Sequence, residues 1–520
     1  MSKSFGRGAA ALAVISIVSK LLGALYRVPL TNILGAEGMG LYQTVFPVFT
    51  VLLMICGGGM TGAVSRTVAK YSARNGESEI KNIFFAAAVP LFAFSVVAAI
   101  TVILLRRVIS SIQGVPGASI AYLALTPSLV FCSVISVLRG VFQGRSMMTA
   151  SGISQLIEQS VKLVLGLLLG KIMLPRGIEY AVFGSLLGVT LSEVAALIYL
   201  LVRYYAYGRK IRGDVTEKPS HSRRELIKEI TSFSLPVTLG LLIIPLTQVF
   251  DSAVVVNMLT RGGVERDRAT ALFGIFVGPV GTLKNMPAVL LSALSAALLP
   301  SLTAHIERGE REAVARDCEK AVGYTLFISL PVAAAFILFP GQICSLLYGA
   351  GLTSDEIAVA SRLLSVEGIS VIYVGVISYT TAVMQSNGKA GRPAVNLMLG
   401  GAAKVALTFL LIPRLGIYGA AAANVSCYAL AAVLGAVNVY GLKNSTSVKA
   451  SAVIRPLVFT AMACAVFYLT NKALGGGTVS VIVSGVTAVL VYLLTALSVK
   501  SACGAPLLPS AWRKQKRLKK

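Results

Sequence analysis

Cationic side chains occur inside stretches of this sequence that are otherwise apolar. Arg27 lies in AALAVISIVSKLLGALYRVPLTNILG, which is long enough to cross a bilayer. A guanidinium there is expensive unless a partner compensates it, so it indicates a functional site. Similar cations lie within or near other hydrophobic stretches, at Lys20, Arg66, Lys162, Lys284, Lys404 and Arg455. This pattern predicts a cationic interior within a membrane, and hence a carrier for an anionic amphiphile.

Arg27 and Lys284 are the two cations best placed to line a cavity, since both fall well inside apolar spans. Arginine offers a planar donor fork and lysine a compact point charge, so a diphosphate is a natural ligand. The other candidates for substrate binding have structural alternatives. Lys20 and Arg66 are close enough to span ends for their charged groups to reach the interface, and Lys162 could pair with a glutamate one turn earlier.

Acidic and amide side chains within the spans are candidates for ion coupling. Asp251, in PLTQVFDSAVVVNML, could bind Na⁺ or carry a proton, and the alternative is a salt bridge to a lysine of the cavity. Asn396 and Glu193 are further candidates for ion coordination or polar packing. Arg362 and Glu367 share a span and are expected to form a structural ion pair. No cofactor is predicted beyond such a coupling ion, and the chain contains no GxxxxGK[ST] phosphate-binding loop.

The composition places these residues in a polytopic membrane protein. Of 520 residues, 56% are hydrophobic and 13% charged, against about 45–50% apolar residues in soluble domains. We predict an all-α protein with about fourteen transmembrane helices. They begin near Ala9, Tyr42, Ile83, Gly117, Gly152, Ile178, Ser232, Ala269, Cys318, Ile357, Pro393, Ile417, Val448 and Gly477.

The spans divide into two lobes that resemble each other in sequence. Nineteen residues separate Gln143 from Lys162 and Gln385 from Lys404, and each lysine is followed by an apolar run, a Pro-Arg pair and a Gly-Ile pair. Six spans per lobe give a parallel pseudo-repeat about an axis along the membrane normal. The predicted parts are an N-lobe at 1–204, a basic linker at 205–231, a C-lobe at 232–442, two further helices at 443–500 and a basic tail at 501–520.

The net charge of +26 is explained by topology. With a cytoplasmic N-terminus, inside segments hold about 30 Lys and Arg residues and outside segments about 9, which places both termini in the cytoplasm. Basic clusters beside spans attract anionic membrane lipids, so no nucleic acid partner is predicted. Catalysis is disfavoured, because the loop acids form no obvious acid–base pair and neither His221 nor His305 belongs to a set of metal ligands.

Four ordered segments carry a resemblance to a known family: SKLLGALYRVPLTNILGAEGMGLYQTVFPVF, RGVFQGRSMMTASGISQLIEQSVKLVLG, LKNMPAVLLSALSAALLPSL and QSNGKAGRPAVNLMLGGAAKVALTFLLIP. They resemble the stage V sporulation protein B and MurJ-like branch of the multidrug/oligosaccharidyl-lipid/polysaccharide exporter superfamily. The resemblance covers essentially the whole chain. It implies a two-lobed flippase of the bacterial cell membrane that carries an undecaprenyl-diphosphate-linked sugar by alternating access.

The resemblance also assigns roles to the cations. Family members of the MurJ type hold the diphosphate with cationic residues of a central cavity, and Lys20 occupies a matching position. Arg27 is displaced by about one residue and Lys284 by about two, and the arginine expected early in the second span is absent from PVFTVLLMICGGG. Two alternatives remain open: a multidrug or organic-ion antiporter of the same superfamily, and a noncatalytic scaffold for cell-wall or spore-cortex synthesis proteins.

Overall fold

The computed structural model describes residues 3–72, 76–211, 221–441 and 450–503, and within these ranges every regular element is a helix. Twelve helical stretches are long and apolar enough to span a membrane. The first, Val14–Tyr71, has 58 residues and turns at Gly35, so it supplies two spans. Together with α6 (Met148–Met173), which packs between α1 and α7, this confirms a polytopic bundle of fourteen spans.

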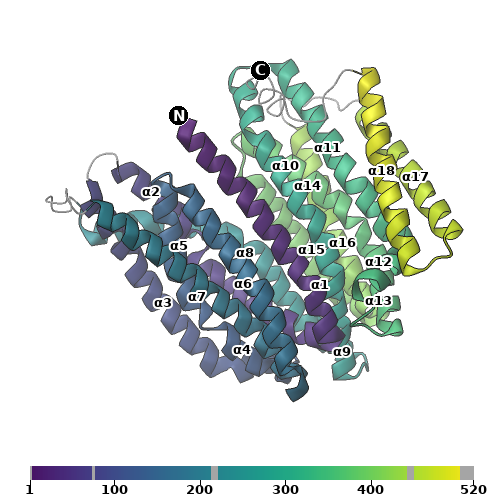
Figure 1. The fold of residues 1–520 in the computed structure, drawn as a ribbon, viewed down its shortest axis with the longest axis horizontal. Coiled ribbons are helices and arrows are strands. Elements are labelled where there is room, and N and C mark those ends of the chain that lie inside the picture. The colour runs from purple at the N-terminus through teal and green to yellow at the C-terminus, as the bar shows by residue number, and fades with distance from the viewer. Residues whose placement is uncertain (1–2, 73–75, 212–220, 442–449, 504–520) are drawn as a thin grey trace.

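The first lobe contains six spans, several of them broken into two helices (Figure 1). Gly35 has a φ of 65° and separates the first span from the second within α1. The elements are α1 (Lys3–Leu53), η1 (Met54–Gly58), α2 (Met60–Ser72), α3 (Gly76–Ile112), η2 (Pro116–Ala118), α4 (Ser119–Leu125), α5 (Ser128–Gly144), α6, η3 (Leu174–Arg176) and α7 (Ile178–Ile211).

The second lobe repeats this order and adds a short helix, α12, which the sequence did not predict. It consists of α8 (Arg223–Arg261), α9 (Arg266–Ile275), η4 (Phe276–Val280), α10 (Gly281–Glu307), α11 (Arg311–Leu338), α12 (Pro340–Tyr348), α13 (Ser354–Gly368), α14 (Ser370–Ser386), α15 (Gly391–Leu415) and α16 (Ile417–Tyr440). Two final helices, α17 (Ala450–Ala473) and α18 (Thr478–Cys503), lie at the side of this lobe (Figure 1).

Helix α8 begins inside the predicted linker at 205–231 and packs against the first lobe. A capping box between Ser222 and Glu225 starts the helix, because each side chain accepts a hydrogen bond from the other residue's backbone amide. Leu226 and Ile230 then join an apolar cluster formed with α2, α3 and α5. Helix α7 also continues into the predicted linker, to Ile211. Residues 212–220 of the linker, and residues 442–449 and 504–520 near the later predicted boundaries, lie outside the described part of the chain.

Equivalent backbone turns precede the two repeated lysines. After α5, the amides of Ser146 and Met147 donate to the carbonyls of Gln143 and Phe142. After α14, the amides of Gly388 and Lys389 make the same two bonds to Gln385 and Met384. Ser146 and Gly388 both have left-handed backbone angles, with φ of 61° and 72°. A π-helix also interrupts the second span of each lobe, at η1 and at η4, so the sequence repeat is matched by local structure.

The lobes contact each other at one end of the molecule and diverge toward the end that holds the N-terminus (Figure 1). At the closed end, the Asn32 side chain donates to the Leu347 carbonyl at 2.9 Å. Gln113 bridges the lobes by donating to the Thr44 carbonyl at 2.9 Å and to the Ser252 hydroxyl at 3.0 Å. These polar contacts, of which the two made by Gln113 are buried, join helices that are far apart in sequence.

A glycine contact makes this closure sensitive to side-chain size. A Cβ atom on Gly274 of α9 would overlap the Ala36 carbonyl oxygen and the Gly40 amide of α1. We therefore expect Gly274→Val to force the lobes apart and to lower the free energy of unfolding by about 1–3 kcal/mol. Thermal denaturation in detergent measures this, with Gly240→Val as control, because Gly240 is exposed and has no atom within 4 Å of its Cβ position. Equal midpoints for the two variants would contradict the contact.

Candidate functional site

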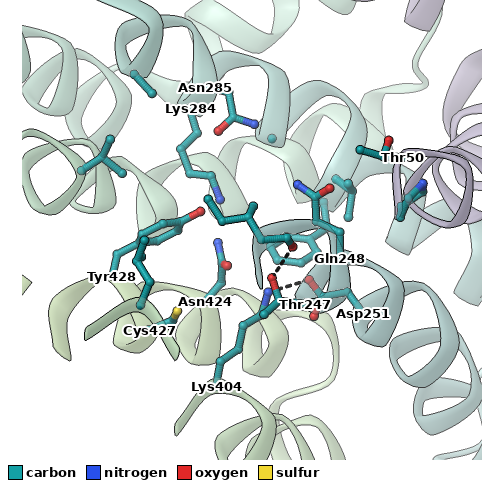
Figure 2. Close-up of a pocket in the computed structure, with 18 of the residues that line it drawn as sticks. Thr50, Thr247, Gln248, Asp251, Lys284, Asn285, Lys404, Asn424, Cys427 and Tyr428 are labelled. Atoms are coloured by element: carbon teal, nitrogen blue, oxygen red, sulfur yellow. Dashed lines mark hydrogen bonds and ion pairs between the residues drawn. The ribbon is translucent and has the colours of Figure 1, made fainter. Parts of the chain in front are cut away.

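A cavity of about 400 Å³ lies between the lobes at the level of Asp251. Figure 2 shows Lys284 and Lys404 entering it from opposite sides, with Asn424 and Tyr428 on one flank and Asp251 on the other. Among the residues that line it, those from α1 are Arg27, Gln43, Phe46, Pro47 and Thr50. The cavity is therefore built from both lobes, and it brings together Arg27, Lys284 and Lys404, three of the six cations that the sequence offers as candidates for substrate binding.

Lys404 of α15 forms an ion pair with Asp251 of α8. The Lys404 ammonium lies 2.5 Å from Asp251 Oδ2, and both side chains are buried. A buried pair of this kind neutralises two charges that would each be costly alone. In this structure Asp251 is therefore the counter-ion of a cavity lysine, which was the alternative to its role as an ion-coupling residue.

Lys284 of α10 pairs with a different acid, Glu367, which is also held by hydrogen bonds from other side chains. Its ammonium lies 3.2 Å from Oε2 of Glu367, whose side chain has no exposed surface. The second oxygen of Glu367 accepts a hydrogen bond of 2.7 Å from Asn424, and Ser370 donates to Oε2 at 3.3 Å. Glu367 thus keeps two hydrogen-bond donors even when Lys284 moves away. The expected pairing of Glu367 with Arg362 is wrong, because Arg362 is exposed and Glu367 faces α10 and α16.

Arg27 has no ion-pair partner among the described residues. Its guanidinium is half-buried and lies 5.8 Å from the centre of the Phe46 ring. Lys162 of α6 approaches the same ring at 5.5 Å and the Tyr26 ring at 5.3 Å. Aromatic faces attract cations without neutralising their charge. Arg27 therefore provides the cavity wall with a cation that no carboxylate neutralises. Lys162 contacts the same Phe46 ring but is not part of the cavity wall.

Four predicted site residues lie outside the cavity lining: Lys162, which is described above, and Lys20, Arg66 and Asn396. Lys20 is exposed on the first half of α1, and Arg66 is exposed on α2 with its guanidinium 4.7 Å from the Phe233 ring. Asn396 is buried against α16, where its carbonyl oxygen accepts a hydrogen bond of 3.0 Å from Asn438. The Asn396 contact is the polar packing that the sequence leaves open as an alternative to ion coordination.

Lys162 does not pair with Glu158, the neighbour proposed from sequence. The Glu158 carboxylate instead accepts a hydrogen bond of 2.8 Å from Arg139 of α5. This partner is nineteen residues away in the sequence, in the preceding span. Helical spacing identified Glu158 as a possible partner for Lys162, but spacing within one helix cannot reveal that Arg139 approaches from a neighbouring helix.

Charge at the central cavity is unequally balanced. Three cations, Arg27, Lys284 and Lys404, belong to its wall, and two of them are matched by Asp251 and Glu367. The polar lining also includes Gln43, Thr50, Gln248, Asn285, Asn424 and Tyr428. Such a surface provides donors for an anionic group and separates it from the surrounding apolar bundle.

Comparisons with known proteins agree with this architecture. The chain is 30% identical over 451 residues to stage V sporulation protein B of Bacillus subtilis (strain 168), covering 84% of each chain. It is 23% identical over 461 residues to the lipid II flippase MurJ of the same organism, covering 84% of this chain and 82% of MurJ. A solved structure of lipid II flippase MurJ in an inward closed conformation superposes with a TM-score of 0.73 at 14% identity, covering 95% of this chain and 99% of that one.

The family assignment follows from these comparisons and the fold. Residues 5–305 match the family described as polysaccharide biosynthesis protein. The MurJ relative and the superposed structure are both named lipid II flippases, which are transporters rather than enzymes. The chain therefore belongs to the polysaccharide biosynthesis protein family and, within it, to the multi-pass membrane flippases related to stage V sporulation protein B and MurJ.

Proposed function

We propose that this protein moves a polyprenyl-diphosphate-linked sugar from the cytoplasmic to the outer leaflet of the bacterial cell membrane by alternating access. The observation that carries the proposal is the cavity between the lobes, whose wall contains Arg27, Lys284 and Lys404 from three different helices. Charge-assisted hydrogen bonds from such groups suit a diphosphate, and the open space accommodates polar sugar atoms. Lipid-linked cell-wall precursors are the substrate class that combines a diphosphate and a polar sugar with a hydrophobic tail.

The two ion pairs suggest how the empty cavity remains stable. Asp251 and Glu367 hold Lys404 and Lys284 while no substrate is present. A diphosphate that enters beside Arg27 offers stronger acceptors, so the lysines exchange their carboxylate partners for phosphate oxygens. Reversal of the exchange after the lobes rock releases the headgroup on the other side. In this proposal Asp251 takes part through its charge, whether or not Na⁺ or H⁺ supplies the driving force.

Orientation follows from the charge distribution. With both termini in the cytoplasm, as the excess of Lys and Arg on that side favours, the lobes diverge toward the cytoplasm and meet at the outer end. The described conformation then corresponds to a carrier that accepts cargo from inside. The polyprenyl tail stays in the surrounding lipid while the headgroup occupies the cavity.

The relative affinities of the protein for lipid diphosphates and for organic cations distinguish this function from export of organic cations. We expect purified protein in native mass spectrometry to retain undecaprenyl diphosphate about 10–100-fold better than undecaprenol, since hydrogen bonds to charged groups contribute about 1.5–3 kcal/mol each. Excess inorganic diphosphate should displace part of the bound lipid. Equal retention of the two lipids, or stronger retention of tetraphenylphosphonium than of either, would overturn the assignment in favour of nonspecific lipid binding or an organic-ion antiporter.

A further inference from the structure

A second, smaller pocket lies within the first lobe, away from the central cavity. It has a volume of about 140 Å³, and its polar wall is formed by Ser136 and Arg139 of α5, Glu158 of α6 and Glu193 of α7. Residues Leu53, Met54, Gly57 and Gly58, at the end of α1 and in η1, close the remaining side. We refer to it as the N-lobe pocket. The volume is sufficient for several water molecules.

Only one of the two carboxylates in the N-lobe pocket is neutralised by a cation. Glu158 receives hydrogen bonds from Arg139 at 2.8 Å and from Gln159 at 2.9 Å. Arg139 is fixed in turn by its Nε donating to the Ser154 hydroxyl at 2.9 Å. Glu158 and Arg139 thus form a closed pair, which leaves no cation in the pocket for the second acid.

Glu193 is that second acid, and it is 7% exposed. No ion pair joins it to any described residue, and its one hydrogen-bonding neighbour is the thiol of Cys132. A thiol is a weak hydrogen-bond donor, so it satisfies only a small part of the hydrogen-bonding capacity of an ionised carboxylate. Every charged or titratable group that faces it lies on α5 or α6: Cys132, Arg139, Glu158 and Lys162. The lysine is directed toward the Tyr26 and Phe46 rings.

We infer that Glu193 is a proton-binding site, and that the N-lobe pocket carries the coupling ion as H⁺. An isolated ionised carboxylate at this depth is costly, and an O–H bond formed on Glu193 changes its charge from negative to neutral and removes that cost. Na⁺ fits less well, because the positive Arg139 guanidinium lines the pocket and already pairs with the Glu158 carboxylate. The inference deepens the proposed function by naming the coupling ion and its site.

The wall of the N-lobe pocket gives this protonation a route to the other lobe. A Cβ on Gly57 would overlap the Ser136 hydroxyl, so η1 lies directly against α5. Two residues later, the Gly59 amide donates to the Thr238 hydroxyl of α8 at 3.2 Å. A π-helix holds one extra residue in its turn and can be rearranged locally, as is common at functional sites. A change of charge at Glu193 therefore acts on a segment that contacts the helix linking the two lobes.

Infrared spectroscopy of the reconstituted protein, without any lipid-linked sugar, tests the site directly. We expect a difference spectrum between acidic and alkaline buffer to contain the carbonyl stretch of a protonated carboxylic acid. Glu193→Gln should remove that signal, and Glu265→Gln, which changes an exposed loop acid, should retain it. Glu193→Asp should keep a signal at a shifted frequency. An unchanged signal in both Glu193 variants, or none in the wild type at any pH, would overturn the inference.

Transport measurements separate this inference from the function it rests on. Movement of a lipid-linked sugar should depend on pH in the wild type and lose that dependence in Glu193→Gln. If the wild type moves no cargo but keeps the Glu193 infrared signal, the proposed function fails and the proton site stands. If cargo moves with the same pH dependence in wild type and Glu193→Gln, the proton site is wrong and the flippase stands.

Discussion

Replacing Lys404 with methionine is expected to destabilise the protein strongly and to abolish transport. The change leaves Asp251 buried without its cation, and breaking one partner of such a pair costs about 3–5 kcal/mol in the free energy of unfolding. Adding Asp251→Asn removes the unpaired charge, so the double variant should recover most of the lost stability. It should not recover transport, because the cavity still lacks the lysine.

Thermal denaturation in detergent and a transport assay on the same preparations measure the two effects. Arg414→Met is the matched control, since Arg414 lies on the same helix but is exposed. If Lys404→Met and the double variant were equally unstable, the loss of stability would not come from the unpaired charge of Asp251. If the double variant transported normally, Lys404 would have no role in binding cargo.

Arg27→Gln is expected to reduce transport by about 10–100-fold while leaving the fold nearly unchanged. Arg27 has no acidic partner among the described residues, so its removal creates no unpaired buried charge. The loss corresponds to one charged hydrogen-bonding group, or about 1.5–3 kcal/mol. Arg27→Lys should restore part of the rate, since it keeps the charge without the planar fork.

The rate of sugar-lipid movement in liposomes, at matched protein amounts, measures this effect. Arg414→Gln serves as control, because it removes an exposed arginine outside the cavity. A rate for Arg27→Gln equal to that of the control would show that the uncompensated cation does not contact the cargo. Loss of folded protein in Arg27→Gln would instead contradict the absence of an ion-pair partner.

The sequence predicted the helical class, the number of spans and three of the cavity cations, because these depend on local patterns. Spans are identified by length and hydropathy, and a cation such as Lys284 stands out in an apolar span. The repeat also gave the register of Lys162 and Lys404, which their shared turn geometry supports. These features need no knowledge of which helices are neighbours.

Partners across helices could not be predicted in the same way. Glu367 meets Lys284 across 83 residues, and Asp251 meets Lys404 across 153. The sequence paired Glu367 with Arg362 because both lie in one span, but a helix presents residues five positions apart to different neighbours. The positions of Lys20 and Arg66 near span ends are compatible with either the cavity or the interface, and only the packing of α1 and α2 places them outside the cavity.

Transbilayer movement of a lipid-linked sugar by the wild-type protein is the decisive measurement of the proposed flippase activity. The measurement places an undecaprenyl-diphosphate-linked sugar in both leaflets of liposomes and follows its accessibility to an external sugar-modifying enzyme. We predict that liposomes containing the protein expose the inner pool of the diphosphate-linked sugar. Protein-free liposomes should not, and neither should liposomes that contain an undecaprenol-linked sugar without the diphosphate. Well-folded protein that leaves the inner pool protected with several lipid-linked sugars would contradict the account and favour the scaffold or the organic-ion antiporter.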